Sequence, residues 1–71
     1  MRTQLASALL RNDQRVVIDR TWSKAACKHN YKVLVTSENG GIIYGYMADT
    51  TNEDEAAQTF LEIATEWGVK A

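Results

Sequence analysis

The sequence predicts a small α+β domain in the order α-β-β-β-α: a three-stranded antiparallel sheet, a C-terminal amphipathic helix packed on one face, and a short N-terminal helix. Two observations lead to this class. Two strand-like runs flank an Asn-Gly-Gly turn, and an apolar stripe recurs with helical spacing near the C-terminus. The 71 residues are 45% hydrophobic and 24% charged, which is the composition of a single globular domain over 1–71.

The first half of the chain predicts a helix followed by a strand. Apolar residues recur at helical spacing over residues 3–11, and few residues there oppose a helix. Residues 15–22 are rich in β-branched side chains, which favours a strand. Residues 23–30 fit either a loop or a single helical turn capped by Ser23, and the sequence leaves both open.

A β-hairpin is predicted around Asn39-Gly40-Gly41, which supplies the positive φ angles of a tight turn. Regular alternation along both strands would place two sets of side chains on opposite faces. The face expected to meet the C-terminal helix carries Tyr31, Val33, Val35, Ile42, Tyr44 and Tyr46. The other face, left for the first helix or a partner, carries Lys32, Leu34, Thr36, Ile43, Gly45 and Met47.

A C-terminal amphipathic helix is predicted over residues 52–67. Asn52 is a favourable N-cap, and the acidic residues 53–55 suit the positive end of the helix dipole, with Glu55 at the capping-box position. Gly68 is a natural C-terminal stop. The stripe expected to face the core comprises Ala56, Phe60, Ile63, Ala64 and Trp67.

Charge is divided unevenly along the chain. Residues 1–35 carry seven Lys or Arg against two Asp, a net charge of +5, whereas residues 36–71 carry one Lys against seven Asp or Glu, a net charge of −6. Either the two halves neutralise each other in the folded domain, or one half faces a charged partner. The balanced total of −1 favours the first explanation.

Residues with catalytic or metal-binding chemistry are few. Cys27 and His29 are two ligands, whereas a structural zinc site needs four. Cys27 is expected to be a small buried hydrophobe and His29 a surface residue, rather than a nucleophile and its base. The acidic residues 53–55 lack the spacing of a hard-cation loop. We therefore expect no enzyme activity, no cofactor and no metal.

The order of elements resembles that of the double-stranded-RNA-binding domain, through the hairpin from Tyr31 to Met47 and the helix start at Asn52. The part from about residue 14 to residue 67 is similar to the arm-binding domain of phage integrases, whose three-stranded sheet enters a DNA groove. The RNA-binding family opens its last helix with lysines that grip phosphates. Residues 53–55 are acidic instead, so that role is not carried over. In size and style the chain is also similar to small accessory proteins of phages, including inhibitors of host defence.

The leading hypothesis is a non-catalytic cytoplasmic module that binds a host or phage protein, as a phage-type accessory protein or an inhibitor of host defence. Its predicted binding residues are Leu34, Ile43, Met47, Glu55, Glu62 and Glu66. The alternative is a small nucleic-acid-binding protein that uses Arg15, Arg20, Lys24, Lys28 and Lys32. No membrane partner is expected, because no apolar run approaches the ~18 residues of a membrane helix and no secretory signal pattern is present. Homodimerisation is left open.

Overall fold

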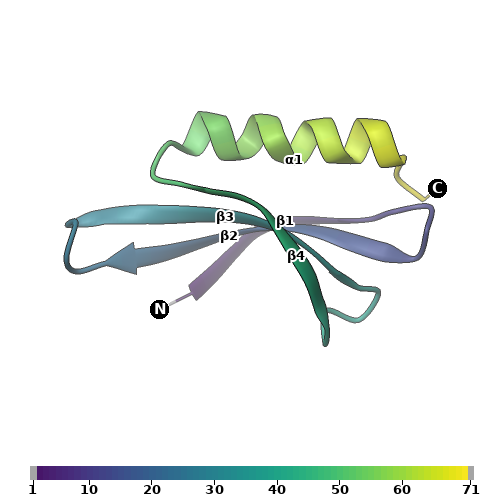
Figure 1. The fold of residues 1–71 in the computed structure, drawn as a ribbon, viewed down its shortest axis with the longest axis horizontal. Helices are drawn as coiled ribbons and strands as arrows, with labels where there is room; N and C mark the ends of the chain where they lie inside the picture. The colour runs from purple at the N-terminus through teal and green to yellow at the C-terminus, as the bar shows by residue number, and fades with distance from the viewer. Residues whose placement is uncertain (1, 71) are drawn as a thin grey trace.

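The computed structural model describes residues 2–70 as one antiparallel sheet and one helix, with α1 lying along a face of the sheet (Figure 1). The strands follow one another in the order β1-β2-β3-β4. The elements are β1 (Arg2–Leu9), β2 (Gln14–Ser23), β3 (Lys28–Ser37), β4 (Ile43–Thr50) and α1 (Glu53–Trp67). The predicted α+β class, the antiparallel sheet and the C-terminal helix are confirmed, but the sheet has four strands and not three.

The predicted N-terminal helix over residues 3–11 is wrong, because residues 3–9 belong to β1 and the turn to β2 follows. Its small apolar residues also alternate with a period of two, and this pattern fits the neighbouring strand. Ala6 lies opposite Ile18 and Ala8 opposite Val16, on the face that α1 covers. Pairing with β2 satisfies the backbone and buries one side of the segment, which outweighs a weak helix propensity.

The β2–β3 hairpin is the centre of the sheet. Its ladder runs without interruption from the pair Gln14–Ser37 to the pair Ser23–Lys28. This confirms the strand predicted over 15–22. The sequence left a loop or a helical turn open for residues 23–30, and the structure has a four-residue turn at 24–27. Ser23 Oγ accepts a hydrogen bond from the Ala26 amide at 3.3 Å. Cys27 lies in this turn and is exposed, so its expected burial is wrong.

The β3–β4 hairpin is irregular, and this changes the faces predicted from alternation. Val33 pairs with Ala48, but Leu34 pairs with Tyr46, so Met47 is an extra residue in β4. Tyr44 is a second extra residue, between the partners of Val35 and Thr36. Such bulges shift every later side chain to the opposite face. Tyr46 therefore shares the face of Leu34, contrary to the predicted arrangement.

The core lies between α1 and the sheet. Its buried cluster consists of Leu10, Val16, Ile18, Tyr31, Val33, Ala56 and Ile63. Asn52 caps α1 as predicted, with its side chain accepting hydrogen bonds from the Asp54 and Glu55 amides. Phe60 packs against the cluster, but Trp67 is 38% exposed and contributes less than predicted.

The end of α1 is tied back to the turn between β1 and β2. Gly68 adopts a φ of 79° and its amide donates to Ala64 O, which ends the helix as predicted. Lys70 donates its amide to Leu9 O, and its ammonium lies 2.7 Å from Asp13. The hydrogen bond to Asp13 and its charge raise the pKa of Lys70 above the ordinary value. This pairing is therefore fully stabilising below the ordinary pKa of lysine and is lost as the pH rises through the folded-state pKa.

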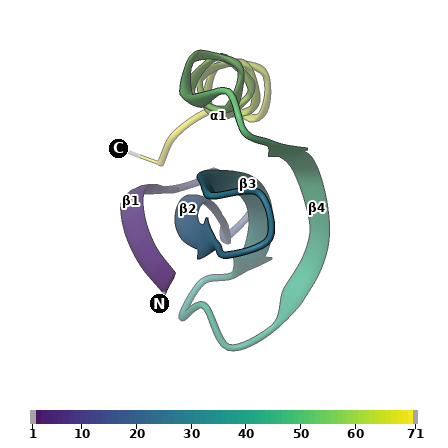
Figure 2. The ribbon, with the colours of Figure 1, turned by 90° about the vertical axis from the view of Figure 1, so that its left-hand side faces the viewer.

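The face of the sheet away from α1 is concave. Figure 2 shows β1 and β4 on either side of β2 and β3, both curving away from the helix. Val17 and Leu34 are buried on this face, which no helix covers within residues 2–70. They line a depression of about 370 Å³ together with polar residues such as Gln4, Arg15 and Glu38.

Candidate protein-binding surfaces

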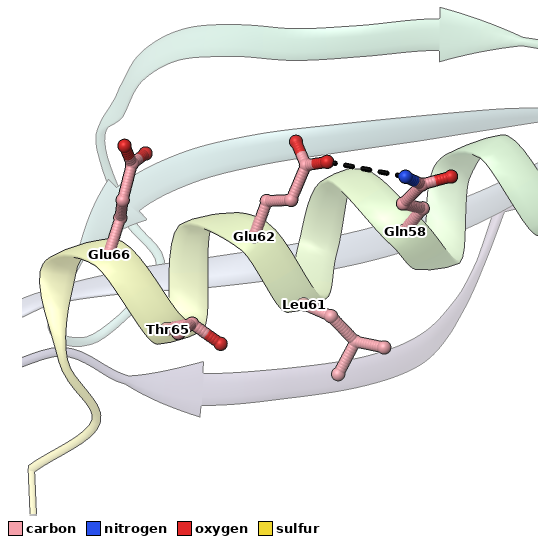
Figure 3. Close-up of a pocket in the computed structure, with 5 residues that line it drawn as sticks. All are labelled: Gln58, Leu61, Glu62, Thr65 and Glu66. Carbon is pink, nitrogen blue, oxygen red and sulfur yellow. Dashed lines mark hydrogen bonds between the residues drawn. The ribbon is translucent and has the colours of Figure 1, made fainter.

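The outer side of α1 carries acidic side chains, and the exposed Leu61 projects from the flank of the helix opposite Glu62 and Glu66 (Figure 3). Gln58, Leu61, Glu62, Thr65 and Glu66 line a shallow depression of about 430 Å³ there (Figure 3). Glu62 and Glu66 project on the same side of the helix, and Gln58 Nε2 donates to Glu62 Oε1 at 3.4 Å. Leu61 is 62% exposed.

A second depression of about 290 Å³ lies where α1 passes β1. It is lined by Leu5, Ala6, Ile18, Glu53, Ala57, Phe60 and Leu61, so its walls are apolar except for one carboxylate. Leu61 lines both depressions. We call the second depression the helix groove, and we call Glu53, Glu62 and Glu66 the acidic rim: Glu53 lines the groove, and Glu62 and Glu66 line the neighbouring depression. An apolar centre with a charged rim is the usual anatomy of a protein interface.

The electrostatic character of this surface follows from α1 itself. The helix carries five carboxylates and no Lys, Arg or His. Two of the predicted binding residues, Glu62 and Glu66, form an acidic ridge on α1 and lie together in one depression. Glu55 is held at the start of the helix, where its Oε2 accepts a hydrogen bond from Thr50 Oγ1 at 3.2 Å. The groove beside the ridge was missed because it needs β1, which was predicted as a helix.

The predicted apolar binding face is only partly available. Leu34 is 2% exposed and buried in the concave side of the sheet. Ile43 and Met47 are exposed on β4, as predicted. Sequence reasoning missed three neighbours that are also exposed, and the signal for them was the run of ten uncharged residues at 39–48. We call the whole set the β4 apolar surface: Ile42, Ile43, Tyr44, Tyr46 and Met47, which are 42% to 60% exposed.

Two of the predicted basic residues lie on the concave face and contact protein groups. Arg15 Nε donates to Glu38 O at 3.0 Å, and its Nη1 donates to Ser7 Oγ at 3.2 Å. The Lys32 ammonium lies 5.6 Å from the centre of the Tyr46 ring, within the range of a cation–π contact. Arg15 thus spans the sheet and its loop, which is a structural arrangement.

The other three predicted cations lie on the end of the β2–β3 hairpin. In the described residues, the last two pairs of this hairpin extend beyond the pairing partners in β1 and β4. We call residues 20–31 the basic arm, because they include Arg20, Lys24 and Lys28 and no carboxylate. Trp22 is half exposed on the arm and meets His29 edge-on, with ring centres 5.1 Å apart. The five predicted cations therefore do not form one surface.

Comparisons of the chain with protein families, with curated protein sequences and with solved structures found no match. Within residues 2–70, no helix is long and apolar enough to cross a membrane. The same part of the chain holds no group of three or more His, Cys, Asp or Glu side chains that is placed to bind a metal ion. The class defined by fold and site is a small α+β domain with a meander sheet, an acidic helix and two exposed apolar surfaces.

Proposed function

We propose that this protein is a non-catalytic module that binds another protein through the helix groove and its acidic rim. The observation that carries the proposal is the position of Leu61, which stands exposed between an apolar groove and the carboxylates of Glu62 and Glu66. Desolvation of a few apolar anchors supplies most of the affinity of an interface. Surrounding charge of one sign raises the association rate and selects a partner of opposite charge.

The charge of α1 defines the partner as a protein with a basic surface. Carboxylates one helical turn apart, such as Glu62 and Glu66, suit the forked donors of arginine. Basic surfaces are typical of proteins that bind nucleic acids. The specific form of the proposal is therefore a phage-type accessory protein that occupies the nucleic-acid-binding surface of a host defence protein, with α1 in place of the phosphates.

The test is capture of the partner from host lysate, followed by binding kinetics with the captured protein. We expect Leu61→Asp to weaken affinity at least about tenfold, mainly through faster dissociation, because it places a charge in the apolar centre. Reversal of Glu62 and Glu66 to lysine should slow association by about tenfold at low salt.

Glu38→Lys is the control, because it reverses a carboxylate that lies outside α1. It should leave the association rate close to that of the wild type. Circular dichroism establishes that each variant is folded. If folded Leu61→Asp and the Glu62/Glu66 double variant bind the captured protein as the wild type does, the helix groove is not the binding surface.

Nucleic-acid binding at the basic arm is the second candidate function. It is favoured by the three cations and the half-exposed Trp22. Single-stranded nucleic acids bind to positively charged surfaces on which their bases stack against aromatic side chains. It is opposed by Glu53, Asp54 and Glu55, which open α1 at the same end of the molecule (Figure 1). The acidic start of the helix would repel phosphates from one side of the arm.

Fluorescence anisotropy with short single-stranded and duplex oligonucleotides separates the two functions. Under the protein-binding proposal, we expect dissociation constants weaker than micromolar at physiological salt. A submicromolar affinity that falls steeply with salt, and that Lys24→Glu with Lys28→Glu abolishes, would establish the second candidate instead. Charge reversal of Glu38 does not alter the arm and serves as the control.

A further inference from the structure

We infer that the β4 apolar surface is the contact between two copies of this chain, which pack side chain against side chain about a two-fold axis. This inference does not rest on the proposed function, because it uses the opposite edge of the sheet. β4 and β1 are the two outer strands, and Figure 2 shows them on opposite sides of the molecule. The helix groove therefore stays open when two β4 surfaces meet.

The exposed area of the β4 apolar surface is large enough for a contact with another protein chain. With about 150–250 Å² for a tyrosine side chain and less for isoleucine or methionine, the observed exposed fractions of the five residues correspond to on the order of 400–500 Å² per copy. A symmetric pair that covers all of it would bury about 800–1,000 Å², the size of the smallest specific interfaces. Exposed apolar patches larger than a few hundred Å² are rare on monomeric proteins, and the largest patch of a domain is often functional. A 71-residue chain with a small core also gains stability from self-association.

The distribution of charge over the surface favours a second copy of the chain as the partner of the β4 apolar surface. In a two-fold contact, the same surface of each copy faces itself, so any net charge on it is repelled. Residues 39–48 carry no charge, and the Lys32 ammonium beside the Tyr46 ring places one cation per copy next to the β4 apolar surface, against five carboxylates on α1. Contact between two α1 helices would oppose five carboxylates with five, and contact between two basic arms would oppose cations with cations. Among these three surfaces, β4 is the one suited to self-association.

The bulges of β4 determine the kind of contact. Tyr44 and Met47 are extra residues in the ladder with β3, so the outer row of backbone groups is irregular. Bulges of this kind disfavour the addition of another strand at an edge. The two copies therefore associate through Ile43, Tyr44 and Tyr46 side chains and not through a continued hydrogen-bonded sheet. Offset contacts between tyrosine rings suit such packing.

Sedimentation equilibrium of the full chain, from micromolar to millimolar concentration, tests the inference. The wild type should show twice the 8.0 kDa mass of one chain. Ile43→Asp should raise the dissociation constant of the dimer at least about tenfold, because it buries two charges that face each other. Leu61→Asp is the matched control, since it places the same charge on an apolar residue of α1 that is 62% exposed, against 45% for Ile43, and it should leave the dimer unchanged.

A second measurement uses the unaltered protein and does not depend on how a variant folds. In a mixture of isotope-labelled and unlabelled wild-type chains, we expect contacts between copies at the Tyr44 and Tyr46 rings in filtered NMR spectra. A monomer over the whole concentration range would overturn the inference. So would a dimer that Leu61→Asp disrupts and Ile43→Asp does not. A monomer whose Tyr44 and Tyr46 signals shift with a single-stranded oligonucleotide would assign the surface to nucleic acid instead.

Discussion

Replacement of Ile63 by alanine is expected to lower the free energy of unfolding by about 3 kcal/mol. Ile63 is 7% exposed and contacts the buried cluster from the middle of α1. Truncation removes buried methyl groups and leaves a cavity, because neighbouring side chains relax only in part. A domain of this length is stable by roughly 4–10 kcal/mol, so the change is a large share of the total. Urea unfolding followed by circular dichroism measures it.

Leu61→Ala is the control for this prediction, because it truncates a residue on the same helix that is mostly in water. Its effect should stay within about 0.5 kcal/mol. Equal destabilisation by the two variants would mean that α1 does not face the sheet through Ile63. In the same series, Phe60→Ala should cost more than Trp67→Ala, because Phe60 packs against the core whereas Trp67 is partly exposed.

Replacement of Gly68 by alanine is expected to cost about 2 kcal/mol. The φ of Gly68 is 79°, a conformation that strains any residue with a Cβ atom. An added Cβ would also lie 2.9 Å from Cδ of Arg11, although that flexible side chain can move aside. Gly68 O accepts the Arg11 amide, so the strain acts on the pairing that ties the end of the chain to β1.

Urea unfolding measures this cost, and hydrogen exchange of the Arg11 and Lys70 amides reports the local pairing. Gly45→Ala is the matched control, because a Cβ there meets no atom within 4 Å and its φ is not in the left-handed region. It should be neutral or slightly stabilising. Unchanged stability and amide exchange in Gly68→Ala would show that this glycine is not required by its conformation.

Local interactions explain what the sequence by itself determined. The limits of α1 depend on Asn52, whose side chain caps the next amides, and on Gly68, which takes a positive φ. The acidic rim follows from helical periodicity, which places Glu62 and Glu66 one turn apart on the exposed side. The strand over 15–22 follows from its β-branched composition. These features involve residues a few positions apart, so their patterns predict them.

Pairing between distant segments decided the rest, and local patterns do not contain it. Residues 3–11 have apolar residues at both helical and strand spacing, and the partner strand β2 selects the strand. The helix groove exists because β1 then lies beside α1, and so its apolar wall was not predicted. The bulges at Tyr44 and Met47 arise from the register between β3 and β4. Because each bulge reverses the side-chain alternation along β4, the register with β3 places Tyr46 on the face of Leu34 and not on the face predicted for it.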